Sequence, residues 1–130
     1  MEFSSRQFAD LVVAVPAGRI DHASAGQFET AMAPLLARAG SAGTGIVLDF
    51  GGVDYISSVG LRVLMIAAKQ MRAHGARIAI AALQPVVAEI FAISRFDGVL
   101  EVFPSVRDAL ERLSAPALAA FDATRAPPAT

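Results

Sequence analysis

The segment from Gly45 to Gly75 most constrains the fold, because it joins a short apolar run to a long amphipathic helix through one brief loop. Gly45 to Phe50 is rich in β-branched residues and bounded by glycine, a pattern typical of a buried strand. From Ser58 onward apolar residues recur at helical spacing, at Leu61, Leu64, Met65, Ala68 and Met71. A strand that feeds a helix predicts an α/β unit. In such units the connecting loop lies at the carboxyl edge of the sheet, where partners and ligands are met.

Two serines, Ser57 and Ser58, end this loop and stand where the helix must begin. A serine hydroxyl there can accept a hydrogen bond from an orphaned backbone N–H, which is the purely structural interpretation. Gly60 argues against capping as the whole account, since glycine in the first turn costs about 1 kcal/mol relative to alanine. It indicates a bare surface that something approaches closely. The helix start also stabilises a phosphate, so a phosphoserine could switch the local charge by roughly −1.5 to −2.

The N-terminal part of the chain predicts strands and one helix. Residues 9–15 have the apolar pattern of a strand, which Pro16-Ala17-Gly18 breaks, and an edge strand over 3–8 precedes it. Ser24 and Gln27 have capping-box spacing, which predicts a helix over 25–39. Pro34 falls inside that helix and is expected to kink or shorten it.

After Gly75 the chain continues to alternate between strand and helix patterns. The patterns predict a strand over 77–82, a helix over 85–93, a strand over 99–103 and a helix that Ser105 and Asp108 open as a capping box. Such alternation requires crossover connections and therefore parallel strands. The expected fold class is α/β, with a mainly parallel central sheet of about four to five strands, about four helices and one antiparallel strand at the N-terminus.

Length and composition bound the function. The chain has 130 residues and a formal net charge of −1, which fits one domain and favours neither nucleic acid nor an anionic membrane surface as a partner. No cysteine is present, which excludes disulfides and thiolate zinc sites. The first residues do not resemble a signal peptide and the apolar runs are too short to span a bilayer, so a cytoplasmic location without membrane insertion is expected. We expect the domain to cover 1–113 and an Ala/Pro-rich mobile tail to cover 114–130, unless Leu118 and Phe121 dock as a short helical turn.

Catalytic interpretations have weak support. Asp21, His22 and Ser58 supply the residue types of a hydrolase triad, but no G-x-S-x-G elbow is present. His22 and His74 do not have metal-ligand spacing. The glycine-rich segment 40–45 precedes its strand and lacks the lysine of a phosphate loop, so it predicts a connector. We therefore expect no enzyme activity, no bound metal and no cofactor.

Asp49 raises one rival from another class, because a response-regulator receiver carries a phosphorylated aspartate at the end of a central strand. Receivers also need an acidic pair after the first strand and a lysine late in the chain, and both are missing here. Asp49 is expected instead to bond the loop backbone at the strand end.

The central segment also carries a family resemblance. Val47-Leu48-Asp49-Phe50, followed by Val53-Asp54-Tyr55-Ile56-Ser57-Ser58-Val59-Gly60-Leu61, resembles the signature of the STAS domain of bacterial anti-sigma factor antagonists. Gly18-Arg19-Ile20-Asp21 resembles the family's Gly-x-Leu-Asp element, and Val102 to Val106 extends the resemblance, so that it spans roughly residues 8–113. In this family the phospho-acceptor precedes the motif glycine by two positions, which maps to Ser58. Ser57 stands where the family often has aspartate and is the second choice.

The resemblance implies a binding module that exchanges partners. The unphosphorylated form would bind an anti-sigma factor of the serine-kinase type, which supplies ATP, and so free a sigma factor to act in transcription. Phosphorylation of Ser58 would release the complex and a phosphatase would reset it. The expected contact surface comprises Gly18, Asp21, Asp54, Tyr55, Ser57, Ser58, Val59, Gly60, Leu61 and Arg62.

Two points stay open at this stage. Leu61 and Arg62 are either an interface anchor and an interface ion pair, or a core residue and a solvated charge. The alternative function is a STAS accessory subunit of a membrane transporter or lipid-trafficking ABC complex, which would present the same edge to an ATPase subunit without phosphorylation.

Overall fold

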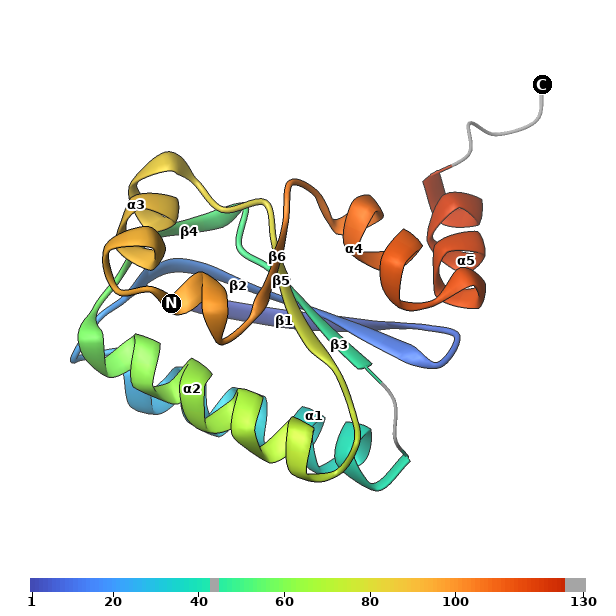
Figure 1. Cartoon of the computed structure of the whole chain (residues 1–130), viewed down its shortest axis with the longest axis horizontal. Coiled ribbons are helices and arrows are strands. Elements are labelled where there is room, and N and C mark those ends of the chain that lie inside the picture. Colours follow the sequence, from blue (N-terminus) through green and yellow to red (C-terminus); the bar gives the residue numbers. More distant parts are fainter. Residues whose placement is uncertain (43–44, 126–130) are drawn as a thin grey trace.

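The computed structural model describes residues 1–42 and 45–125, which form a central sheet with helices on both faces (Figure 1). The strands of the described part are β1 (Glu2–Phe8), β2 (Leu11–Ile20), β3 (Gly45–Asp49), β4 (Gly52–Ile56), β5 (Ile78–Ala81) and β6 (Glu101–Phe103). The helices are α1 (Ala25–Ala42), α2 (Ser58–Ala73), α3 (Pro85–Ile93), α4 (Val106–Leu113) and α5 (Ala115–Arg125), with a short 3₁₀ turn over Phe96–Gly98. None of these helices is both long and apolar enough to cross a membrane.

The strands pair in the order β1-β2-β3-β5-β6, and β4 pairs with β2. β1 runs antiparallel to β2, whereas the other pairs are parallel. The expected mainly parallel α/β sheet with one antiparallel N-terminal strand is therefore confirmed. The register also places the carboxyl ends of β2 and β4 side by side, which positions the two loops that follow them.

β2 is longer than the sequence predicts, because Pro16 does not end it. One edge of β2 pairs with β3 as far as Ala14 and with β4 from Ala17 onward. Pro16 falls in the gap between these two partners. A residue without an N–H donor is tolerated where no neighbouring strand needs that donor.

The segment over 52–56, predicted as loop, forms β4. It pairs with the second half of β2, and the register shifts between Gly18 and Arg19, where Gly18 has a φ of +97° that favours glycine. Val53 and Ile56 are buried while Asp54 is exposed. β4 therefore hides its apolar residues and still presents a polar side chain to solvent.

The start of α1 differs from the predicted capping box. The Ser24 hydroxyl lies 2.7 Å from the Arg19 carbonyl oxygen, and the Gln27 side chain donates to the Met1 carbonyl. The chain enters α1 through a turn around Asp21, whose carboxylate accepts from the backbone N–H groups of Ala23 and Ser24. Asp21 thus takes the role that the sequence analysis gave to Ser24.

α1 continues past Pro34 to Ala42 and is not shortened by it. Pro34 and Thr30, whose carbonyl loses its usual partner, are both on the exposed side, so water can satisfy the carbonyl. The predicted connector over 40–45 is helical as far as 42, and residues 43–44 lie outside the described part of the chain.

Two apolar clusters lie on opposite faces of the sheet. α1 and α2 pack side by side on one face, where α3 lies beside β4, and α4 and α5 cover the other face (Figure 1). Phe50 links the first cluster, with its ring centroid 6.5 Å from both Phe28 of α1 and Phe91 of α3. The rigid body so formed holds the first turn of α2 in a fixed place.

Residues 115–125 form the helix α5 in the segment where the sequence predicts an Ala/Pro-rich tail. Phe121 packs edge-on against Phe8 of β1 at 5.4 Å between ring centroids. The Ser114 hydroxyl donates to Asp10 at 2.6 Å, which fixes the start of α5 against the β1–β2 turn. The docking of Phe121 is the alternative that the sequence left open; residues 126–130 lie outside the described part.

Candidate functional site

The two segments singled out in the sequence meet at the ends of β2 and β4. Arg19 pairs with Tyr55 and Ile20 with Ile56 across these parallel strands. The Ser57 N–H then donates to the Ile20 carbonyl at 2.8 Å. The loop after Gly18 and the start of α2 are therefore neighbours, as the sequence predicts.

The two serines occupy different environments. Ser57 is the N-cap of α2, and its hydroxyl oxygen accepts from the Gly60 N–H at 3.2 Å. Its side chain is buried, with 6% of its surface exposed. Ser58 is the first residue of the helix and is exposed. Ser57 thus caps the helix, and Ser58 carries the exposed hydroxyl. The sequence alone could not assign these two properties.

Gly60 is buried, so the close approach that it permits is internal. A Cβ atom at this position would lie 2.7 Å from Ile56 Cγ1 and 2.8 Å from Ile20 Cγ2, which is shorter than real carbon contacts. The expectation that Gly60 keeps a bare surface for a partner is therefore wrong. Glycine is needed because the first turn of α2 packs directly on the ends of β2 and β4.

The neighbouring residues divide into core and surface. Leu61 is 8% exposed and belongs to the core, which decides between its two interpretations. Val59 is 36% exposed, and Arg62 and Asp54 are exposed as well. Val59, the cation Arg62 and the anion Asp54 therefore lie near Ser58 in the sequence, and all three are accessible to a partner.

Arg19 joins the loop after β2 to β4. Its guanidinium carbon lies 4.4 Å from the ring centroid of Tyr55. Its Nε also lies 3.5 Å from a carboxylate oxygen of Asp21, in a pair whose side chains are 60% and 34% exposed. Such an exposed pair contributes little stability by itself, but the stacking on Tyr55 fixes where the Arg19 charge lies.

Hydrogen bonds lower the pKa of Asp21. Burial raises its pKa, but the bonds from the Ser24 hydroxyl, from the backbone of Ser24 and Ala23 and from Arg19 outweigh this effect and hold the pKa below the ordinary aspartate value. Asp21 is therefore a fixed negative charge beside Arg19. Its carboxylate is engaged in the turn before α1, which explains its place in the motif without any catalytic role.

Two other residues considered for phosphorylation or metal binding, Asp49 and His74, have structural roles in the described part of the chain. Asp49 accepts from the Gly51 N–H at 2.9 Å, which confirms its prediction as a strand-end residue that bonds the loop backbone. The His74 ring lies 2.9 Å from the Gln70 carbonyl at the end of α2. In the described part of the chain, no three histidine, aspartate or glutamate side chains gather where they could hold a metal ion.

Comparisons with known proteins identify relatives of this chain. A family model described as STAS domain matches residues 3–109. A curated relative from Bordetella bronchiseptica, named as the candidate anti-sigma factor antagonist BtrV, is 36% identical over 104 residues, which cover 80% of this chain and 84% of the relative.

Solved structures share the fold. A candidate anti-sigma factor antagonist from Thermotoga maritima matches with a TM-score of 0.78 and 19% identity over 85% of this chain and 93% of its own. The cell fate determinant SpoIIAA of Bacillus, solved in its phosphorylated form, matches with a TM-score of 0.64 and 18% identity over 85% of this chain and 98% of its own. At these identities the structural likeness speaks for the fold alone.

Proposed function

This chain belongs to the STAS domain family, and we propose that it is an anti-sigma factor antagonist whose partner binding is switched by phosphorylation of Ser58. The name of the relative from Bordetella bronchiseptica supports the antagonist assignment. The proposed partners are an anti-sigma factor serine kinase, which holds the ATP, and a phosphatase that removes the phosphate. This chain then supplies the acceptor hydroxyl and the binding surface, and no catalytic group.

One observation carries the choice of Ser58. Its side chain is exposed on the first residue of α2, whereas the Ser57 hydroxyl is buried and already accepts a bond from Gly60. A kinase must bring the acceptor oxygen into line with the γ-phosphate of ATP, which requires an accessible side chain. Ser58 meets this requirement without any rearrangement of the helix start.

The position also suits a phosphate that leaves the fold intact. The free N–H groups and the positive dipole end of a helix favour an anion at its first residue. Arg62 follows Ser58 by one helical turn, where residues four apart lie on the same face. The phosphorylated protein should therefore keep its structure and differ mainly in surface charge.

Release of the partner follows from that charge. Val59 and Arg62 offer an apolar contact and a cation beside Ser58, which suit an interface of mixed character. A dianion enclosed there without a new cation opposite it costs several kcal/mol, which corresponds to about a hundredfold loss of affinity or more. The same surface can thus hold the partner in one state and reject it in the other.

Phosphate mapping tests the proposal. The protein is incubated with a candidate anti-sigma factor serine kinase and with ATP, and the modified residue is located by mass spectrometry. We expect phosphate on Ser58 in the wild type and in Ser57→Ala, and none in Ser58→Ala. Phosphate on Ser57 alone, or none with a kinase that is active on another substrate, would overturn the assignment.

The transporter-subunit alternative makes a different prediction. There the same edge of the sheet would bind an ATPase subunit without modification, and the charge of residue 58 would not control binding. Equal affinity of Ser58→Ala and Ser58→Asp for the natural partner would favour that alternative. No residue of the described structure favours it over the switch.

A further inference from the structure

We infer that the protein also binds a small carboxylic acid with an apolar body, in a cavity on the face of the sheet opposite α2. The cavity lies between the sheet and the helices α4 and α5 and has a volume of about 350 Å³. Its walls are mostly apolar and include Phe8, Val13, Val15, Val106 and Phe121. Ligand pockets span roughly 300–1,000 Å³, so this one suits a small ligand.

The strand register explains why the two charged residues of this cavity, Arg6 and Asp49, share the wall formed by the sheet. Arg6 of β1 pairs with Val13 of β2, which in turn pairs with Val47 of β3. Alternate residues of a strand point to the same face, so Arg6, Val13 and Asp49 all lie on the α4–α5 side. Asp49 and Ala82 follow at the carboxyl ends of β3 and β5, the edge at which α/β sheets bind ligands.

Arg6 is the feature that points to an anion. Its guanidinium carbon stacks 5.2 Å from the centroid of the Phe8 ring, and it forms no ion pair with any residue that the structure describes. A planar guanidinium beside an apolar wall matches a carboxylate that carries an apolar body.

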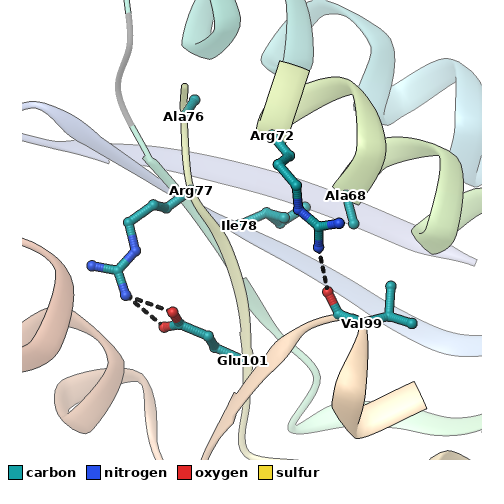
Figure 2. Close-up of a pocket in the computed structure, with 7 residues that line it drawn as sticks. All are labelled: Ala68, Arg72, Ala76, Arg77, Ile78, Val99 and Glu101. Atoms are coloured by element: carbon teal, nitrogen blue, oxygen red, sulfur yellow. Dashed lines mark hydrogen bonds and ion pairs between the residues drawn. The ribbon is translucent and has the colours of Figure 1, made fainter. Parts of the chain in front are cut away.

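The hollow between α2, β5 and β6 provides a contrast (Figure 2). There Arg77 points at Glu101, with its Nη2 2.6 Å and 2.7 Å from the two carboxylate oxygens. Arg72 donates to the Val99 carbonyl at 3.4 Å. Both cations of that hollow already have partners within the protein, so nothing there calls for a ligand anion.

Asp49 sets the orientation of the ligand. Asp49 lies two strands across the sheet from Arg6 and two residues further along. With strand spacings of roughly 4.8 Å and a rise of roughly 3.3 Å per residue, their Cα atoms are about 12 Å apart. One of its oxygens accepts from the Gly51 N–H, which holds the carboxylate in place. Because like charges repel, the ligand carboxylate is directed to the Arg6 end and its apolar body lies over Val13 and Val15.

The backbone at the cavity is also strained. Ala82, which lines it, has a φ of +62°, a conformation uncommon for residues other than glycine. Strained residues of this kind gather at ligand sites, where the surrounding structure holds them. This feature is independent of the charge argument and concerns the same cavity.

Calorimetric titration with sodium octanoate tests the inference, with octanol and octylammonium as probes of the same length but different charge. We expect octanoate to bind at least about tenfold more tightly than either. Arg6→Gln should raise the octanoate Kd about tenfold, while Arg72→Gln, the same change at the other hollow, should leave it unaltered. Val15→Phe, which fills the cavity, should abolish binding.

The outcomes separate the parts of the inference. Equal Kd values for octanoate and octanol, or an unchanged octanoate Kd in Arg6→Gln, would overturn the choice of a carboxylate. Absence of octanoate binding by the wild type at millimolar concentration would overturn the site itself. Arg6 is exposed, so its variant folds even where Val15→Phe does not, and the inference stays falsifiable.

Discussion

The hydroxyl oxygen of Ser57 accepts a hydrogen bond from the Gly60 N–H at 3.2 Å, beneath the surface on which Ser58 is exposed. Ser57 and Gly60 are thus bonded to each other within the start of α2. The structural and the switching interpretations of the two serines therefore do not compete. Each belongs to a different residue, and each can be tested by a different substitution.

Ser57→Ala should lower the free energy of unfolding by about 0.5–2 kcal/mol, because it removes an N-cap hydrogen bond. Urea denaturation measures this change. Ser58→Ala, one residue later and exposed, is the matched control and should change stability by less than about 0.5 kcal/mol. A larger loss for Ser58→Ala than for Ser57→Ala would contradict the assignment of the cap.

Gly60→Ala should destabilise the protein by about 1–3 kcal/mol, because the added methyl group would overlap Ile56 and Ile20. Gly26→Ala provides the control, since a Cβ atom there meets nothing within 4 Å. That helical glycine should tolerate alanine, with stability unchanged or raised by up to about 1 kcal/mol. Thermal or urea unfolding of both variants makes the comparison, and equal effects would speak against the internal packing of Gly60.

The sequence predicts where the site lies, but it does not predict which of the two serines is buried and which is exposed. Helical periodicity places the start of α2 to within a residue, but Ser57 and Ser58 are adjacent, and which of them is buried depends on how β4 enters the helix. The sequence did not predict β4, because Asp54 and Tyr55 interrupt its apolar pattern. Gly60 signalled a close approach, yet only the packing of Ile20 and Ile56 shows that the approach is internal.

Long-range contacts explain why the sequence did not predict the full length of β2 or the helix α5. Pro16 appeared to end a strand because its tolerance depends on where β3 stops and β4 begins to pair with β2. The segment after Leu113 has the composition of a tail, and its helix is held by Phe8 and Asp10 from the other end of the chain. Such contacts leave no local pattern, whereas the parallel α/β class follows from local alternation and was predicted correctly.

Ser24→Ala should raise the pKa of Asp21 toward the ordinary aspartate value, because the hydroxyl is the largest of the contributions that lower it. A carboxyl whose folded pKa is depressed stabilises the protein fully above its unfolded pKa of about 3.9, and this stabilisation is lost as the pH falls through the lower folded value. The variant should therefore lose less stability on acidification than the wild type. NMR titration of the Asp21 carboxyl carbon measures the shift, and an unchanged pKa would contradict the proposed hydrogen-bond control.

Phe121→Ala should lower the free energy of unfolding by about 1–2 kcal/mol, less than the 3–5 kcal/mol typical of a fully buried phenylalanine, because Phe121 is only partly buried. Phe121→Leu retains most of the apolar contact with Phe8 and should lose less. Denaturation curves for both variants test whether α5 is part of the folded body. If neither substitution changes stability, the domain ends before α5, as the sequence analysis proposed.

Ser58→Asp should separate binding from stability. An acidic residue at the first position of a helix interacts favourably with its dipole, so the free energy of unfolding should stay the same or rise by about 0.3–1 kcal/mol at low ionic strength. Ser58→Lys reverses the charge and should lower it by a similar amount. Affinity for the anti-sigma factor should nevertheless fall in Ser58→Asp, since its charge enters the proposed interface, whereas Ser58→Ala should bind as the wild type does. Denaturation and binding titrations on the same three variants make the test. If Ser58→Asp binds weakly only because it is unfolded or destabilised, an unfolding defect and not an electrostatic switch would account for its behaviour.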